Sequence, residues 1–267
     1  MSQRLRLSLP NEEDRISDLP DSLLHHILSF LPTKDATVTI LPSKRWKSLL
    51  SQSIINLDDN HFPHPSAFCK FFNSFIASRD KNLPIVTFNL KCHHKTYREK
   101  DIPNLVSTAL QRQLENLIID FCNSNFPSLV PNTKTLTFLK LKSVTILRDP
   151  DVDLPSLKVL HLESVTFGQR PYLSKILRAC PIIHDLVTKD LAVKKLSPTL
   201  LCPIDTSLSK LVRANISGVH IYFDQLQNVE HLRLHVVCYV SYSYQMFIYS
   251  NDFYLIILFL THADLAI

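Results

Sequence analysis

A short apolar pattern that recurs between residues 85 and 234 constrains the fold more than any other feature of the chain. Each copy has an apolar residue, two other residues, a second apolar residue, one other residue and a third apolar residue. Successive copies begin 29, 22, 21, 26, 25 and 21 residues apart. The last two apolar positions alternate as they do along a β-strand, so each copy predicts one strand with a buried side. The clear copies are Ile85-x-x-Phe88-x-Leu90, Leu114-x-x-Leu117-x-Ile119, Leu136-x-x-Leu139-x-Leu141, Leu157-x-x-Leu160-x-Leu162 and Val229-x-x-Leu232-x-Leu234, and shorter ones are Ile183-x-x-Leu186 and Leu208-x-x-Leu211.

Units of this kind are expected to stack. A single unit cannot bury its own apolar residues, and stacking places the strands of neighbouring units side by side in a parallel sheet. Leu173, Ile176 and Leu177 have helical spacing and fit a short helix on the opposite side of that sheet. The segments 154–158 (LPSLK), 160–165 (LHLESV) and 177–186 resemble the units of plant leucine-rich repeats. The prediction is an α/β fold whose leucine-rich-repeat solenoid spans residues 83–237 and carries a parallel β-sheet on one face.

The residues between the buried strand positions should face outward. Because they lie on neighbouring strands, they are expected to form a ladder of mixed charge. Two interpretations stay open, a solvated exposed sheet and a surface that binds a target protein. The candidates for target binding are Lys140, Lys142, His161, Glu163, Asp185, Lys189, His231, Arg233 and His235.

Helical patterns occupy the N-terminal region after the polar residues 1–13, which we expect to be disordered. Apolar residues at positions 19, 23, 24, 27, 28 and 31 form one wide stripe of a first helix, with Pro20 in its first turn. Thr33 is expected to cap a second helix and Ser43 a third. Three short helices cannot bury this much apolar surface by themselves, so part of the stripe should face a partner.

Three segments of this region carry a resemblance to a known family. Residues 14–24 (DRISDLPDSLL), 27–36 (ILSFLPTKDA) and 43–47 (SKRWK) resemble the F-box of plant F-box/leucine-rich-repeat proteins over residues 14–58. The resemblance implies a three-helix module that binds a Skp-type adaptor and, through it, a cullin and a RING subunit. The matching positions are Leu19, Pro20, Leu23, Leu24, Ile27, Leu28, Leu31, Pro32 and Trp46.

The sequence leaves open which of these positions contact the adaptor and which fill the core of the box. An amphipathic stripe without the motif would more often be plain core. One residue departs from the family pattern, because Pro42 stands where relatives carry an aliphatic residue before Ser-Lys-Arg-Trp. Inside a helix such a proline costs about 3 kcal/mol, so we expect adaptor binding to be weakened if Pro42 is helical.

The remaining segments complete the predicted organisation. Phenylalanines at helical spacing predict a connecting helix over residues 59–82. Residues 238–267 form a hydrophobic tail that is similar neither to further repeats nor to the C-terminal domain of relatives, and its apolar run is too short to span a bilayer. We therefore expect a truncated or alternatively spliced product whose tail covers the open end of the repeats or promotes aggregation.

Composition excludes several functional classes. With 2 glycines, the chain cannot form the glycine-rich phosphate loops of nucleotide-dependent enzymes. The net charge of +5 is scattered along the sequence, whereas nucleic-acid binders concentrate their basic residues. The 6 cysteines include no C-x-x-C pair, and the N-terminus has no signal peptide, which favours reduced, mostly buried thiols and a location in the nucleus or cytoplasm.

No catalytic or metal-binding constellation emerges. Cys92-His93-His94 and His61-x-x-His64 lack the second pair of ligands that zinc requires, so loop histidines are the favoured interpretation. We expect no enzyme activity, no cofactor, no metal and no membrane partner. The predicted function is the substrate-recognition subunit of an SCF-type ubiquitin ligase. The alternative is a leucine-rich-repeat interaction protein that does not assemble into a ligase.

Overall fold

The computed structural model describes residues 16, 18–31, 33–40, 54–80, 82–94, 97, 101–124, 133–147, 149–169, 171–194, 208–217, 226, 228–238 and 254–259. The chain divides into two compact units, Met1–Gln52 and Ser53–Ile267. Each unit is described by itself below. No helix among the described residues is long and apolar enough to cross a membrane.

The first unit contains the helices α1 (Asp21–Ser29) and α2 (Thr33–Ile40). Pro20 is the residue that precedes α1, with an extended backbone, instead of lying inside the first turn as predicted. Its carbonyl accepts hydrogen bonds from the backbone N–H groups of Leu23 and Leu24. Leu24, Leu28 and Ala36 form a small core, against which Leu19 and Leu31 pack. The third helix predicted from Ser43 lies outside the described residues.

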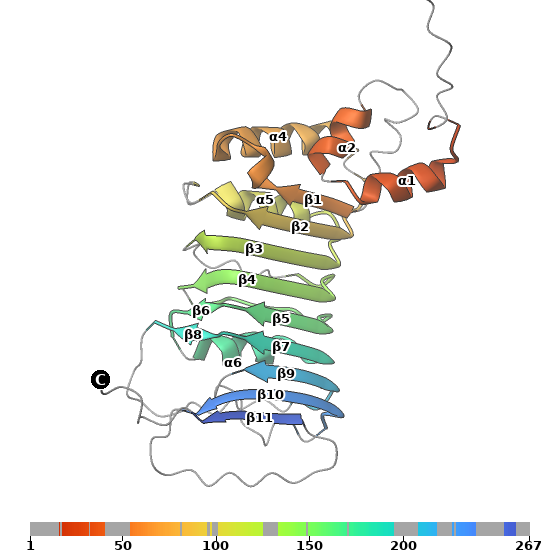
Figure 1. Cartoon of the computed structure of the whole chain (residues 1–267). Coiled ribbons are helices and arrows are strands. Elements are labelled where there is room, and N and C mark those ends of the chain that lie inside the picture. The colour runs from red at the N-terminus through yellow and green to blue at the C-terminus, as the bar shows by residue number, and fades with distance from the viewer. Residues whose placement is uncertain are drawn as a thin grey trace, which may run out of the picture. The chain divides into compact units, whose positions relative to one another are not determined.

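The second unit is built on one long parallel sheet (Figure 1). Nine described strands succeed one another in the order β1-β2-β3-β4-β5-β7-β9-β10-β11, and every neighbouring pair is parallel. This arrangement confirms the predicted α/β class and parallel sheet. The strands are β1 (Ile54–Asp58), β2 (Thr87–Cys92), β3 (Asn116–Ser124), β4 (Phe138–Ile146), β5 (Val159–Glu163), β7 (Asp185–Lys189), β9 (Arg213–Ser217), β10 (His231–Cys238) and β11 (Tyr254–Phe259).

The strand register places equivalent positions of successive repeats side by side. Leu139 pairs with Leu160 on the next strand, and Leu160 pairs with Leu186 on the one after. All three are completely buried, and the residues directly before and after each of them on its strand are half-exposed. The apolar positions of the repeating pattern therefore form continuous buried rows, as their period predicts.

Three strands of the long sheet differ from the sequence prediction. In β9 the inward residues are Ala214 and Ile216, so the copy predicted from Leu208 was placed three residues too early. The reason is that alanine, although apolar, is too small to mark a core position in a pattern of leucines. The strands β1 and β11 were not predicted at all. β1 lies within the segment assigned to the F-box, and β11 lies within the tail and continues the sheet beside β10.

Helices cover parts of this sheet. The predicted connecting helix is α4 (Pro65–Ser78), which begins at Pro65 and is capped by His64, whose Nδ1 accepts from the Ala67 N–H at 3.1 Å. It lies at the β1 end of the sheet (Figure 1), where the rings of Phe72 and Phe88 meet edge to face at 5.9 Å between their centroids. An apolar helix at this end covers the first repeat, which has no preceding unit. Two further helices, α5 (Asp101–Leu110) and α6 (Pro171–Arg178), follow β2 and the short strand β6.

Three residues at equivalent places in successive repeats have left-handed backbone geometry. Ser143, Ser164 and Asp190 have φ angles of 54°, 51° and 52° at equivalent places in three successive repeats. Beyond these turns, β6 (Thr166–Phe167) and β8 (Ala192–Val193) form a second small parallel sheet with the end of β4. A positive φ is uncommon outside glycine, and in these repeats serine and aspartate adopt it.

The structure describes the side chains of three cysteines, and two of them are buried, in agreement with the sequence prediction. Cys92 and Cys180 are buried and Cys69 is half-buried, and none of the three forms a disulfide bond. Burial raises the pKa of the Cys180 thiol to about 12, and burial together with the charge of Asp59 raises the pKa of Cys92. These thiols therefore act as small apolar side chains.

Gly168 supplies a stability test of the repeat geometry. Its N–H donates to the carbonyl of Ile146 at 2.7 Å, and a Cβ on this residue would lie 2.7 Å from the backbone oxygen of Leu147. We expect Gly168→Ala to lower the free energy of unfolding by about 1–3 kcal/mol, because two backbones must move apart. Gln169→Ala, at the exposed neighbouring position, should change it by less than about 0.5 kcal/mol. Urea unfolding measures both, and equal values for the two variants would refute the close approach.

Candidate protein interaction surfaces

One face of α1 exposes large apolar side chains. Leu23, Ile27 and Phe30 are 48%, 47% and 73% exposed, and Ile16 before the helix is 57% exposed. Positions 23, 27 and 30 follow one another at helical intervals of four and three, so the three side chains share one face. A soluble domain seldom leaves such a group uncovered unless a partner binds it.

The structure separates the predicted adaptor-binding residues into two sets. Leu24 and Leu28 are 0% and 1% exposed and fill the small core, and Leu19 and Leu31 are partly buried against it. Pro20, Leu23 and Ile27 are exposed. Pro32 and Trp46 lie outside the described residues. Sequence reasoning missed Phe30 and Ile16 as surface residues, although the spacing from Leu23 and Ile27 could have indicated Phe30.

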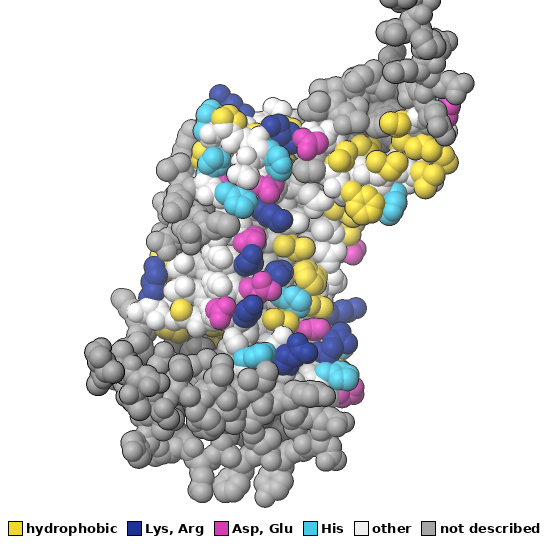
Figure 2. Space-filling view, viewed as in Figure 1, with side chains coloured by type: hydrophobic (Ala, Val, Ile, Leu, Met, Phe, Trp, Pro, Cys, Tyr) yellow, Lys and Arg dark blue, Asp and Glu magenta, His cyan; other side chains and the backbone are white. Residues whose placement is uncertain are grey.

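The outward face of the long sheet carries the second candidate surface (Figure 2). All nine residues predicted for target binding are half-exposed or exposed on this face, which confirms their predicted orientation. The strand register places Lys142 beside Glu163 and Glu163 beside Lys189. The same row continues toward β1 through Asp120, Lys91 and Asp58, so acidic and basic side chains alternate across six strands.

Ion pairs neutralise much of the charge in the middle of this face. Lys142 donates to Asp120 at 2.9 Å and Lys140 donates to Glu163 at 2.7 Å. Asp185 accepts from Arg213 at 2.9 Å and lies 3.8 Å from the Nε2 of His161. Each half-exposed pair adds little to stability, and its main effect is to hold the side chains in fixed positions.

Apolar side chains lie among these charges. Ile118, Phe138, Val159 and Val187 are half-buried on the outward face, and Phe138 pairs with Val159 across β4 and β5. The ring of Phe138 meets that of His161 edge to face at 5.3 Å between centroids. Burial lowers the pKa of His161, although the nearby Asp185 carboxylate raises it in part. The centre of the face thus combines apolar area with paired charges, a mixture suited to protein recognition.

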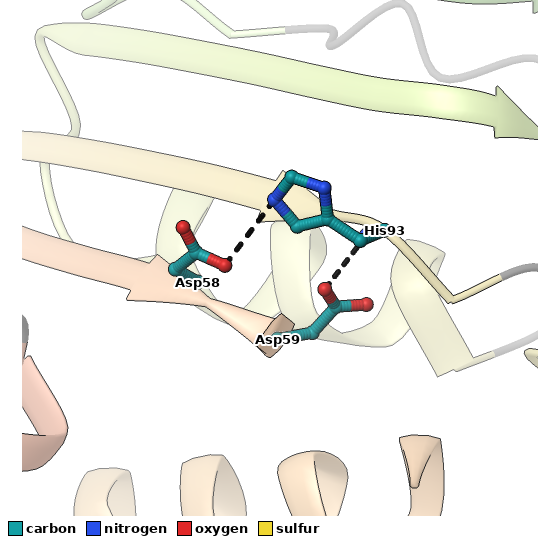
Figure 3. A group of neighbouring side chains, drawn as sticks. All are labelled: Asp58, Asp59 and His93. Carbon is teal, nitrogen blue, oxygen red and sulfur yellow. Dashed lines mark hydrogen bonds and ion pairs between the residues drawn. The ribbon is translucent and has the colours of Figure 1, made fainter. Parts of the chain in front are cut away.

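A third group lies where β1 and β2 end (Figure 3). Asp59 is completely buried. Its carboxylate accepts hydrogen bonds from the N–H groups of His93 and His94 at 2.7 and 3.0 Å and from the Tyr97 hydroxyl at 2.7 Å. Asp58 pairs with the His93 ring at 3.3 Å. These bonds connect residues 34 or more positions apart, and no local pattern could have revealed them.

Asp58, Asp59 and His93 bring three potential metal ligands within 4.8 Å of one another. Asp59 already accepts three hydrogen bonds, and Asp58 accepts one from the N–H of Asn60 at 2.9 Å in addition to its pair with His93. Burial, above all, raises the pKa of the Tyr97 hydroxyl, which donates to Asp59. The arrangement is that of a buried carboxylate that fixes the chain after β2.

Comparisons with known proteins agree with this architecture. The F-box domain model matches residues 16–58, and the Leucine Rich Repeat model matches residues 156–181. An F-box/LRR-repeat protein of Arabidopsis thaliana is 32% identical over 250 residues, which are 84% of this chain and 46% of that protein. Another F-box/LRR-repeat protein of the same plant is 34% identical over 197 residues, or 69% of this chain and 42% of its own length.

A third relative carries an additional domain in its name. This F-box/FBD/LRR-repeat protein of Arabidopsis thaliana is 34% identical over 185 residues, which cover 67% of this chain and 42% of that protein. No solved structure matches the chain. Together with the helices and the parallel sheet, these matches show that the chain belongs to the plant F-box/leucine-rich-repeat family. It spans about half the length of the curated relatives it matches.

The Asp59 carboxylate gives a matched pair of stability variants. Asp59→Ala should lower the free energy of unfolding by about 3 kcal/mol or more, because it leaves two N–H groups and the Tyr97 hydroxyl without their acceptor. Asp58→Ala, which removes a half-exposed pair and one capping bond, should cost about 1 kcal/mol. Chemical denaturation compares the two, and an equal loss would contradict the buried role of Asp59.

His161 gives a pH-dependent prediction. Because burial lowers its pKa below the ordinary 6.5, the unfolded chain binds the proton more readily than the folded chain. The contribution of neutral His161 to the free energy of unfolding is therefore complete above pH 6.5, and it is lost as the pH falls below that value. We expect the stability of the wild type to fall more than that of His161→Gln between about pH 7 and pH 5. Parallel stability curves would show that His161 is not responsible.

Proposed function

We propose that the chain is a substrate-recognition subunit of an SCF-type ubiquitin ligase. In this role its F-box binds a Skp-type adaptor, the adaptor links it to a cullin, and the repeats hold the target protein. Support comes from the F-box and repeat matches and from two surfaces of different chemistry, one apolar and one mixed in charge. The chain itself would be non-catalytic, with ubiquitin transfer performed by other subunits.

The exposed apolar face of α1 is the observation that carries the adaptor proposal. Burying one leucine, isoleucine or phenylalanine side chain contributes about 1.5–3 kcal/mol. Leu23, Ile27 and Phe30 together can therefore supply much of the free energy of a specific complex. Their neighbours Leu24 and Leu28 are already buried in the box core, so they would position the face instead of contacting the adaptor.

The target would bind the outward face of the sheet. Strands in register hold its side chains in rows, and the ion pairs limit how far the charged groups move. Pre-positioned groups lose less entropy on binding, which favours recognition by such a face. We also propose that the protein acts in the nucleus or cytoplasm, where ligases of this type would meet their targets.

The α1 face can be tested by alanine substitution. Leu23→Ala, Ile27→Ala or Phe30→Ala should each weaken binding to a purified plant Skp adaptor by about 10- to 100-fold, because each removes a buried apolar side chain from the interface. Ser22→Ala, at an exposed polar position of the same helix, should change the affinity by less than about twofold. Isothermal titration calorimetry measures the affinities, and unaltered melting temperatures show that the box still folds.

The same assay separates the two functional hypotheses. Unchanged affinity in all three alanine variants would contradict an adaptor site on this face. If the intact chain does not bind and Pro42→Leu restores binding, the chain is an interaction protein outside the ligase. Pro42 itself lies outside the described residues.

A further inference from the structure

Basic side chains gather toward the β10 end of the sheet face (Figure 2). We call this group the basic end, and it consists of Lys189, Arg213, His231, Arg233 and His235. All five are exposed on the outward side of three consecutive strands, β7, β9 and β10. The register places Arg213 beside His231. Lys189 stands beside Glu163 of β5, so the group adjoins the mixed-charge centre of the face.

Positive charge exceeds negative charge at the basic end. Among the outward residues of β7, β9 and β10, Asp185 is the one carboxylate that the structure describes, and it already pairs with Arg213 and His161. Lys189 and Arg233 make no ion pair with any described residue. The centre of the face differs, because Lys140 and Lys142 are both bound to carboxylates there. A ligand at the basic end would therefore meet two cations, Lys189 and Arg233, that no described carboxylate neutralises.

Apolar area lies next to these cations. Val187 of β7 and Val159 and Phe138 on the adjoining strands are half-buried on the same face. Three strand steps separate β5 from β10, and at about 4.8 Å a step this is about 14 Å. An extended peptide of four or five residues covers that distance. One short segment could then place apolar side chains on the centre of the face and acidic side chains on the basic end.

We infer that the basic end is the docking site for a segment of the target protein that carries aspartate or glutamate residues beside apolar ones. This inference rests on the proposed function, in which the sheet face holds the target. The cations of the basic end would attract the acidic residues of the segment by charge complementarity. The half-buried valines and Phe138 would contact its apolar residues. A nucleic acid fits less well, because Glu163 and Asp185 stand within the face and would repel a continuous phosphate backbone.

Selection from a random peptide library tests the inference without knowledge of the target. The probe is a phage library of peptides of about 12 residues, long enough to cross the face in extended form. It is panned against the full chain, against a Lys189→Glu/Arg233→Glu variant, and against a Lys70→Glu/Lys91→Glu control. The control has the same change in net charge at two exposed lysines, one on α4 and one on β2 of the same face.

Peptides selected by the wild type and by the control should be rich in aspartate and glutamate, and the charge-reversed variant should lose this preference. A fluorescein-labelled selected peptide should bind the reversed variant at least about tenfold more weakly in fluorescence anisotropy, and the control within about twofold. Its affinity should also fall with added salt. Circular dichroism would check that both variants fold.

Three results would overturn the inference: no acidic enrichment, an equal loss in the control, or displacement of the peptide by single-stranded DNA that binds more tightly. Adaptor binding, measured in parallel, separates the two proposals. Adaptor binding without acidic selection would refute only this inference. Acidic selection without adaptor binding would refute the ligase proposal and leave the docking site standing.

Discussion

The parallel pairing of strands in one continuous register is the constraint on which the second unit depends. A strand alone cannot bury its inward apolar side chains, and these become buried because the same positions of the neighbouring strands lie beside them. Leu139, Leu160 and Leu186 show the principle, since each is completely buried between its equivalents. The helix α4 covers the apolar residues of the first repeat. The buried Asp59 accepts hydrogen bonds that fix the residues following β2.

The same register that buries one side of each strand organises the other. The register fixes which outward side chains lie beside one another. A substitution on one strand therefore alters the surroundings of residues on the two adjacent strands. This is why acidic and basic residues alternate from Asp58 to Lys189, and why Asp185 serves both His161 and Arg213. The first unit follows a different rule. In its α1 helix, one row of apolar side chains fills the core and an adjacent row is exposed, as is typical of interaction surfaces.

Much of the fold could be predicted because the repeat is periodic and its anchors are large. Strands β2 to β5 follow directly from leucine, isoleucine and phenylalanine at fixed spacing. The repeat pattern was misplaced at β9, where Ala214 stands at a position that other repeats fill with a large apolar residue. β1 was missed because its Ile55 and Leu57 lie within the segment assigned to the F-box. The orientation of the charged ladder was predictable from alternation alone. Its partial neutralisation was not, because the ion pair between Lys140 and Glu163 depends on side-chain geometry.

The candidate sites show the same limit. The F-box motif identified α1, but packing in the small core with Leu28 and Ala36 distinguishes Leu24 from Leu23. The two leucines are neighbours in sequence and opposite in exposure. The bonds of Asp59 to the N–H groups of His93 and His94 join chain positions that no short motif connects. Local patterns therefore revealed the elements and their faces, and long-range contacts decided which residues remain available to a partner.

We propose that the adaptor binds the apolar face of α1 and that the target binds the sheet face. Hydrogen–deuterium exchange of the full chain, with and without a purified Skp-type adaptor, tests this claim directly. We expect slower exchange in residues 21–31 on addition of the adaptor and unchanged exchange in the strands β2 to β10. Protection of those strands, or unchanged exchange in α1 within a complex that does form, would contradict it.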